Sequence, residues 1–241
     1  MIIYKNLNIR KEHKNAVIAI GNFDGIHLGH QKVLKEAKLK AKKNKLKFGL
    51  VTFEPVPVMY FNPEIKNHRI NNYEQKLYYL KKLNLDFIVI IKFNKSFSRI
   101  FAKDFIKKII FNKLNANYIF VSKNFRFGKK RKGNVRILKE YEDHYFFKTI
   151  ITSPYKKNKK TISSSLIRKK IKQGKIIETR DLLGRNWSIE GKVVKGNQRG
   201  RKIGFPTCNI RLNDYVLPKL GVYAVLVENN LFKKKGIANI G

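Results

Sequence analysis

The sequence predicts an α/β protein, an open parallel sheet with helices on both faces, followed by a smaller all-β module. Two observations lead to this prediction. Short apolar segments alternate with amphipathic ones over the first two-thirds of the chain, and after Trp187 the pattern changes to short strands with glycine turns. Strand–helix alternation is typical of parallel sheets with crossover helices. Closely spaced short strands are typical of small β-barrels.

The predicted strands of the parallel sheet are short and apolar. "DFIVIIKF" (86–93) is a continuous apolar run, as expected of a strand that is buried on both faces. The other predicted strands are "AVIAIG" (16–21), "KFGLVTF" (47–53) and "NYIFVS" (117–122). Ligands of such sheets bind beyond the carboxyl ends of the strands.

The predicted helices have apolar residues at helical spacing. Residues 30–45 place Val33, Leu34, Ala37 and Ala41 on one face, and residues 73–84 do the same with Leu77, Leu80 and Leu83. The other predicted helices cover residues 101–114, 163–175 and 179–184. In the second module, strands are expected at 188–196, 221–229 and 234–241. We therefore expect one domain over residues 1–185 and another over 186–241.

The charge is extreme: 54 Lys and Arg residues against 16 Asp and Glu residues give a formal net charge of +38. Nucleic-acid binding is one interpretation. However, the basic residues are mostly lysine and occur in nearly every segment, which favours a bias of the whole surface over a binding groove. Small anionic substrates such as nucleotides suit the same field, so no specific nucleic-acid partner is expected.

Three features indicate a soluble cytoplasmic protein without a membrane partner. No apolar run approaches the ~20 residues that a membrane-spanning helix needs. The N-terminal residues lack the long apolar region of a secretory signal. Cys208 is the only cysteine, so an internal disulfide framework is excluded.

The stretch "GNFDGIHLGH" (21–30) carries the clearest chemical signal, because it follows the first apolar strand and precedes a helix. Its glycines allow close backbone approach. The unpaired N–H groups and dipole of a helix beginning near Gly29 favour an anion, phosphate above all. His27 and His30, three residues apart, can donate hydrogen bonds to phosphate oxygens. A glycine turn with ordinary histidines is the bland alternative. A zinc pair is disfavoured because no third ligand cluster is evident.

Five stretches, in order, resemble the bacterial bifunctional riboflavin kinase/FMN adenylyltransferase (FAD synthetase) family. "HLGH" resembles the HxGH signature of nucleotidylyltransferases, and "GNFDGIHLGH" the longer family string. The other four are "VTFEPVP" (51–57), "SKNFRFG" (122–128), "ISSSLIR" (162–168) and "GRKIGFPTCNI" (200–210). The resemblance implies a Rossmann-like nucleotidylyltransferase domain followed by a partial antiparallel, flavokinase-like β-barrel. Another HxGH nucleotidylyltransferase, or a basic nucleic-acid-binding protein on a nucleotide-binding fold, is the alternative.

The implied reaction transfers AMP from ATP to FMN, giving FAD and pyrophosphate. The FMN phosphate has its second pKa near ~6 and is already anionic, so it needs no general base. The resemblance implies His27, His30 and Arg168 as catalytic residues. Asn22 and Asp24 are implied to contact the nucleotide or magnesium. The implied ATP-binding residues are Gly21, Asn22, Phe23, Asp24, Gly25, Gly29, Ser163, Ser164 and Ser165, with the serines and Arg168 against the β- and γ-phosphates.

Asn124, Phe125 and Phe127 resemble the flavin-side loop, although core packing is an equal alternative for the two aromatic rings. In the kinase module, Gly204, Thr207 and Asn209 are implied to bind Mg·ATP. Magnesium is otherwise expected to be held through phosphates. The substrates are thus ATP and FMN, with riboflavin for the complete family, while the oligomeric state is not predicted.

The chain departs from the family pattern at four positions: Val56 replaces a histidine, Ser122 a glycine, Ser165 a threonine and Cys208 an alanine. Val56 removes a polar group, which is expected to lower affinity or rate.

The family's kinase module continues past Gly241 into strands that carry its glutamate base. These 241 residues are therefore expected to make FAD but not to phosphorylate riboflavin. Because all the adenylyl-transfer motifs precede residue 169, a truncation near Asn186 is expected to keep that activity. It is also expected to be at least as soluble, since it removes an exposed, unpaired sheet edge.

Overall fold

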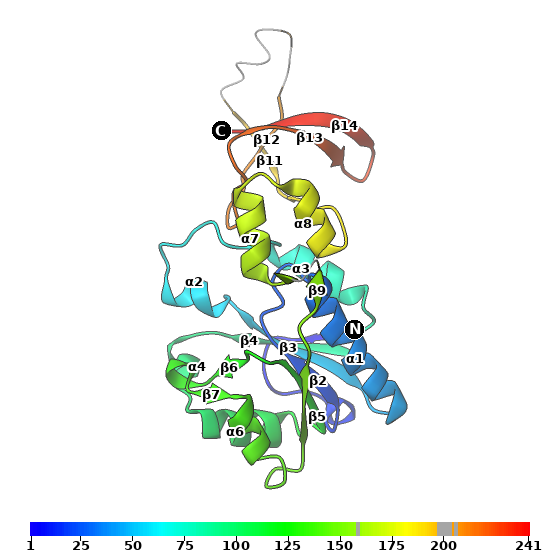
Figure 1. Cartoon of the computed structure of the whole chain (residues 1–241), viewed down its shortest axis with the longest axis vertical. Helices are drawn as coiled ribbons and strands as arrows, with labels where there is room; N and C mark the ends of the chain where they lie inside the picture. The colour runs from blue at the N-terminus through cyan, green and yellow to red at the C-terminus, as the bar shows by residue number, and fades with distance from the viewer. Residues whose placement is uncertain (158–159, 197–203, 205–206) are drawn as a thin grey trace.

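The first part of the chain forms a six-stranded, wholly parallel sheet in a computed structural model that describes residues 1–157, 160–196, 204 and 207–241 (Figure 1). The strand order is β1-β4-β3-β2-β5-β8. The strands are β1 (Ile2–Tyr4), β2 (Val17–Ile20), β3 (Phe48–Glu54), β4 (Phe87–Lys92), β5 (Tyr118–Ser122) and β8 (Lys148–Thr152). The predicted α/β class is confirmed, and the four predicted strands are β2, β3, β4 and β5.

Helices and short elements connect the strands. The helices are α1 (Leu28–Lys43), α2 (Pro57–Phe61), α3 (Tyr73–Lys81), α4 (Lys95–Ser98), α5 (Ala102–Asp104), the π-helix η2 (Phe105–Lys113), α6 (Val135–Glu140), α7 (Ser164–Lys172) and α8 (Ile176–Leu183). The short elements are the 3₁₀ turns η1 (Lys11–His13) and η3 (Lys129–Arg131), and the two-residue strands β6 (Arg126–Phe127), β7 (Gly133–Asn134), β9 (Lys156–Lys157) and β10 (Lys160–Thr161).

The two edge strands, β1 and β8, were not predicted from the sequence. Both are short and partly exposed, so neither shows the continuous apolar run of a central strand. The helix predicted over 101–114 divides into α5 and the π-helix η2.

Two apolar clusters cover the two faces of the sheet. Alternation along β2 sends Ile18 to one face, with the buried residues of η2, and Val17 to the other, with α1 and α3. The predicted helix faces are correct: Leu34 and Leu80 are fully buried in the second cluster.

A third cluster joins α7 and α8 to distant segments of the chain. It contains Ile70, Ile167, Leu183 and Val216, all completely buried, with Trp187 packed against them. Figure 1 shows α7 and α8 between the sheet and the C-terminal strands. Residues from both sides of position 186 thus share one core.

The C-terminal region contains antiparallel strand pairs, as predicted. β13 (Gly221–Glu228) and β14 (Lys233–Ile240) form a hairpin, and β11 (Val193–Val194) pairs with β12 (Asn209–Ile210). The strand expected at 188–196 is wrong in length, since only its two valines are in strand conformation. Among the described residues, no helix combines the length and apolar character needed to cross a membrane.

Candidate adenylyl-transfer site

The loop between β2 and α1 lies where the strand order of the sheet reverses. β2 has β3 on one side and β5 on the other, and the chain builds outward from it in both directions. A crevice forms at such a switch point, beyond the carboxyl ends of the strands, and it is the usual ligand site of open α/β sheets. The "GNFDGIHLGH" stretch therefore stands where the topology favours a ligand.

His27 caps α1, which begins at Leu28, one residue earlier than the predicted start near Gly29. Its Nδ1 accepts a hydrogen bond from the backbone N–H of His30 at 3.2 Å. The two imidazole rings are stacked with centroids 3.6 Å apart. A Cβ at Gly29 would lie 3.1 Å from the His27 ring, so glycine leaves room for this stack.

Both histidines are held neutral. Burial, followed by the positive charges of Arg168 and Arg185, lowers the pKa of His27 to about 4. Burial, followed by His27, Lys76 and Arg168, lowers the pKa of His30 well below its usual value. Because Nδ1 of His27 is an acceptor, its ring proton sits on Nε2, which is the atom available to donate.

The His30 ring has a buried nitrogen without a partner. Its Nδ1 makes no hydrogen bond to any residue that the structure describes. Buried polar atoms are nearly always paired, so an orphan in a crevice suits a group that acquires its partner from a ligand.

The depressed pKa of His27 predicts a pH-dependent stability. Unfolded His27 takes up a proton near pH 6.5 and folded His27 only near pH 4, so its contribution of about 3 kcal/mol is complete above pH 6.5 and is lost as pH falls to 4. His27→Asn, which keeps a good helix N-cap, should therefore flatten the fall of the unfolding free energy between these pH values. Urea titrations at several pH values measure this. His144→Asn, at an exposed position, is the control. An unchanged slope in His27→Asn would contradict the assignment.

Asp24 connects the loop to α7. Its carboxylate is buried, accepts the backbone N–H of Ile70 at 3.1 Å and pairs with Nη2 of Arg168 at 2.6 Å. Its backbone carbonyl accepts the Ser164 hydroxyl at 2.8 Å. The structure thus brings the two predicted nucleotide motifs together, and engages the Asp24 carboxylate with protein donors.

The three serines at the start of α7 differ in their surroundings. Ser163 caps the helix by accepting the N–H of Leu166 at 3.2 Å, and Ser164 is bonded to Asp24. Ser165 instead lines an open pocket of about 430 Å³ with Arg168. His68, Lys169, Lys172 and Gln173 complete this pocket. Its basic lining suits an anion.

The predicted flavin-side residues follow β5, the neighbour of β2. Asn124 is exposed, while Phe125 and Phe127 stack on each other with centroids 5.4 Å apart. Phe127 is only 6% exposed and packs on Phe105 in the core. This burial favours the packing interpretation for Phe127.

The predicted residues of the kinase module lie in its described margins. Thr207 and Asn209 are exposed, with Asn209 in β12, and Gly204 has a positive φ of 80°. Most of the predicted loop at 195–204 lies outside the described residues. Across the described part of the chain, no three His, Cys, Asp or Glu side chains gather as a metal site would need.

Arg185, which was not predicted from the sequence, supports the loop between β2 and α1 (residues 21–27), which we call the histidine loop. Its guanidinium donates to the carbonyl of Gly25 at 2.7 Å and to that of Ile26 at 3.2 Å, and it lies 3.8 Å over the Tyr79 ring. Ile26 has a positive φ, which is unfavourable for a β-branched residue, so these bonds help to hold the turn. No local sequence signal points to an arginine 160 residues away.

The segment His68–Asn72, which we call the strap, was also missed. On one side, the His68 carbonyl accepts a hydrogen bond from Nε of Arg168 (2.8 Å), and the Ile70 N–H donates one to the Asp24 carboxylate. On the other side it pairs with the C-terminal region: His68 and Arg69 N–H groups donate to the Asp214 carbonyl, and Val216 donates to the Arg69 carbonyl. The Arg69 guanidinium also pairs with Glu54 of the "VTFEPVP" stretch.

Val56, the main departure from the family pattern, is buried and apolar at the start of α2.

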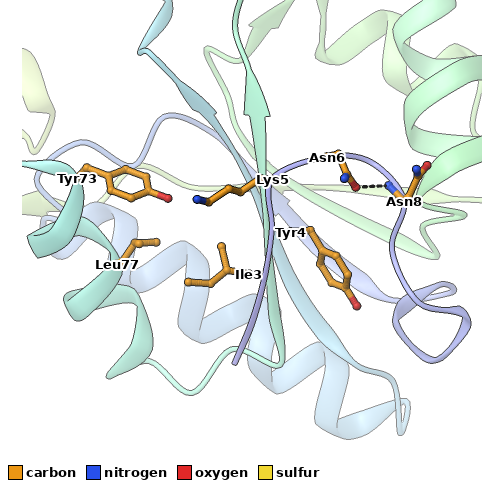
Figure 2. Close-up of a pocket in the computed structure, with 7 residues that line it drawn as sticks. All are labelled: Ile3, Tyr4, Lys5, Asn6, Asn8, Tyr73 and Leu77. Atoms are coloured by element: carbon orange, nitrogen blue, oxygen red, sulfur yellow. Dashed lines mark hydrogen bonds between the residues drawn. The ribbon is translucent and has the colours of Figure 1, made fainter.

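A second pocket, of about 580 Å³, lies between the edge strand β1 and the start of α3 (Figure 2). Its lining includes Lys5, Asn6 and Tyr73 but none of the predicted site residues. Of these two pockets, the smaller, basic one is lined by predicted site residues, Ser165 and Arg168.

The chain is similar to known proteins over almost its whole length. The FAD synthetase family model matches residues 9–166, and the riboflavin kinase family model matches residues 183–241. The bifunctional riboflavin kinase/FMN adenylyltransferase of Buchnera aphidicola (Schizaphis graminum) is 45% identical over 97% of this chain and 76% of its own length. The Escherichia coli K12 protein of the same name is 34% identical over 95% of this chain and 73% of its own length.

A solved structure shares the fold over the whole chain. It is described as a macrolide-efflux protein from Streptococcus pneumoniae, is 32% identical and superposes with a TM-score of 0.85. The match covers all of this chain and 78% of that one. The residues on both sides of position 186 therefore occur together in one known fold.

Proposed function

Because this chain belongs to the family of bifunctional riboflavin kinase/FMN adenylyltransferases, we propose that the β2–α1 loop and the start of α7 form its site of adenylyl transfer to FMN. One observation carries the proposal: the Asp24–Arg168 pair joins the stacked histidines to α7 at the carboxyl end of β2. In this site an oxygen of the FMN phosphate attacks the α-phosphorus of ATP. The bond between the α-phosphorus and the oxygen that bridges it to the β-phosphorus breaks, and pyrophosphate leaves with that oxygen.

Neutral histidines suit this reaction. The nucleophile is an anionic phosphate, so no proton has to be removed from it. The barrier lies in the charge that develops on the transferring group, which preorganised donors stabilise. With a pKa of about 4, His27 carries no extra proton near neutral pH and acts as a hydrogen-bond donor, not as an acid. We assign His30 the same role.

Arg168 and Ser165 are assigned to the leaving pyrophosphate. Both line the basic pocket, and a guanidinium can bind two phosphate oxygens at once. Asp24 is assigned to positioning Arg168, because both of its oxygens already accept protein donors. Gly21, Asn22, Phe23, Gly25, Gly29, Ser163 and Ser164 complete the ATP side in this proposal.

Asn124 and Phe125 are proposed for the flavin side, since they follow β5 next to the histidine loop. Magnesium is proposed to arrive with ATP. The described residues offer no carboxylate cluster to hold it alone, and Mg²⁺ commonly binds through substrate phosphates with few protein ligands. Bound there, it would neutralise phosphate charge.

We propose that the residues of the adenylyl-transfer site all lie within residues 1–185 and that residues 186–241 form the kinase module, as the match of residues 183–241 supports. In that module Thr207 and Asn209, with Gly204 in the preceding turn, are proposed to bind Mg·ATP. Incubating the chain with FMN, ATP and Mg²⁺ and separating the products by chromatography tests the main activity. FAD and pyrophosphate are expected, and their absence from folded protein would overturn the proposal.

His30→Ala tests the histidine assignment. It removes one preorganised donor, and such losses typically lower the rate by about 10²–10³-fold. We expect a fall of this size in kcat/KM for FAD formation, with an intact fold by circular dichroism. His144→Ala, at an exposed position, controls for the loss of a histidine. Activity within a few-fold of the parent protein would show that His30 does not contact the reacting phosphate.

A further inference from the structure

Lys76 places a buried ammonium group at the carboxyl end of β3, next to the histidine loop. It belongs to α3 and is only 5% exposed. Its Nζ donates to the hydroxyl of Thr52 at 2.6 Å, and that hydroxyl donates to the carbonyl of Asn22 at 3.2 Å. Through Thr52, Lys76 is therefore linked to Asn22, the second residue of the "GNFDGIHLGH" stretch, although it comes later in the chain.

Among the described residues, no carboxylate forms an ion pair with this ammonium, although Glu54 and Asp24 act on it from a greater distance. Within the described residues, Lys76 has no acidic side chain within 4.0 Å. The two acidic groups that act on it are already paired, Glu54 with Arg69 and Asp24 with Arg168. An ammonium removed from water without a counter-charge is costly, and a neutral side chain would fill the same space at a lower cost. A purely structural role does not account for the charge.

Lys76 and Arg168 both lie close enough to the His30 ring to act on its charge. Both cations lower the pKa of His30, after burial and His27. Burial lowers the pKa of Lys76 itself to about 8, Glu54 and Asp24 raise it, and Arg69 lowers it. The ionisable groups around Lys76 are thus Glu54, Asp24, Arg69 and His30.

We propose that Lys76 is a further phosphate-binding residue of the adenylyl-transfer site. This inference rests on the proposed function. An ammonium has three donors, and toward the described residues Lys76 uses one of them, on Thr52. The remaining two are assigned to a phosphate oxygen, either of FMN or of the α-phosphate of ATP. The bound anion then supplies the counter-charge that the protein lacks.

The test compares Lys76→Met and Lys76→Arg with Lys81→Met, which removes an exposed lysine of the same helix. FAD formation by the full chain is measured from pH 6.5 to 9.5, varying FMN and ATP separately. Lys76→Met should lose about 10²-fold in kcat/KM without losing thermal stability, because a buried charge without a counter-charge is removed. Lys81→Met should behave like the parent protein.

The pH profile separates binding from structural support. The parent activity should fall above about pH 8 as Lys76 loses its proton. Lys76→Arg stays charged, so this alkaline fall should disappear. An effect on the KM of FMN alone assigns the contact to the FMN phosphate, and an effect on that of ATP alone assigns it to the α-phosphate.

Two results would overturn the inference. One is activity of folded Lys76→Met within threefold of the parent, and the other is an unchanged alkaline fall in Lys76→Arg. If Lys76→Met does not fold, the profile of Lys76→Arg alone decides. Absence of FAD formation by the parent protein would refute the proposed function itself, which keeps the two failures distinguishable.

Discussion

Replacing Asp24 by alanine should lower the free energy of unfolding by about 3–5 kcal/mol and FAD formation by at least about 10²-fold. The carboxylate is buried and serves two donors at once, the Ile70 N–H and the Arg168 guanidinium. Its removal leaves a buried N–H without an acceptor and a largely buried cation without its counter-charge. Both costs are large because water cannot replace the lost partner.

Arg168→Met should be as damaging, for the reciprocal reason that the Asp24 carboxylate remains buried and unpaired. The double variant Asp24→Asn/Arg168→Met carries neither charge. We expect it to recover most of the stability, since neutral side chains of similar shape replace a buried ion pair at little cost, while its activity stays low. Urea titration and steady-state kinetics on all the variants measure the two effects separately.

The control is Arg136→Ala, which breaks an exposed pair with Glu140 at 3.1 Å. Exposed pairs contribute about 0–1 kcal/mol, so its stability should hardly change. If Asp24→Ala were as mild as Arg136→Ala, the pair would not organise the site. If the double variant regained activity, Arg168 would have no direct role in the reaction.

The sequence predicted those parts of the molecule whose signals are local. Four central strands are visible as apolar runs, and the histidine loop and the Ser163–Arg168 stretch are visible as motifs. What joins these motifs is not local. The Asp24–Arg168 pair spans 144 residues, and Arg185 lies 160 residues from the Gly25 carbonyl that it binds. No periodicity or spacing encodes such contacts, because they exist only once α7 and α8 pack beyond the sheet.

The role of Lys76 could not be predicted from local sequence signals either. In the sequence it is one of many lysines on a helix whose apolar face was correctly predicted. Its burial follows from the position of α3 beside β3, which composition does not reveal. The strap was missed because residues 68–72 are mostly polar and form no helix or strand, the pattern of an ordinary loop.

A chain that ends at residue 186 should lose most of its solubility and at least about 10-fold of its FAD formation, the opposite of the expectation from the motifs alone. All the adenylyl-transfer motifs remain in this chain. However, the strap loses the backbone partners Asp214 and Val216 and the Trp187 indole, which donates to the Ile70 carbonyl at 2.9 Å. The truncation also opens the third apolar cluster, in which Ile70 is fully buried.

The truncation is expected to act by disordering the strap. The lost hydrogen bonds matter less in themselves, because water can hydrate most of the polar groups that the truncation exposes. Ordering each backbone residue costs about 1–2 kcal/mol, and the contacts that offset this cost for the strap come partly from residues 187–216. Gln75, also fully buried, adds bonds to Ser188 and to the Tyr215 hydroxyl (2.8 Å). A mobile strap would release the Ile70 N–H from Asp24 and the His68 carbonyl from Arg168, so the site would lose its geometry.

A chain that ends at residue 218 is the matched control. It lacks the β13–β14 hairpin but keeps Trp187, Ser188 and the Asp214–Val216 segment, and therefore every contact to the strap described above. We expect it to keep FAD formation within about threefold of the full chain, in contrast to the chain that ends at 186. Soluble yield, thermal unfolding and FAD formation measured side by side decide the matter. Equal activity of the two truncated chains would mean that the strap holds its shape without the C-terminal region, and that position 186 separates two independent folding units.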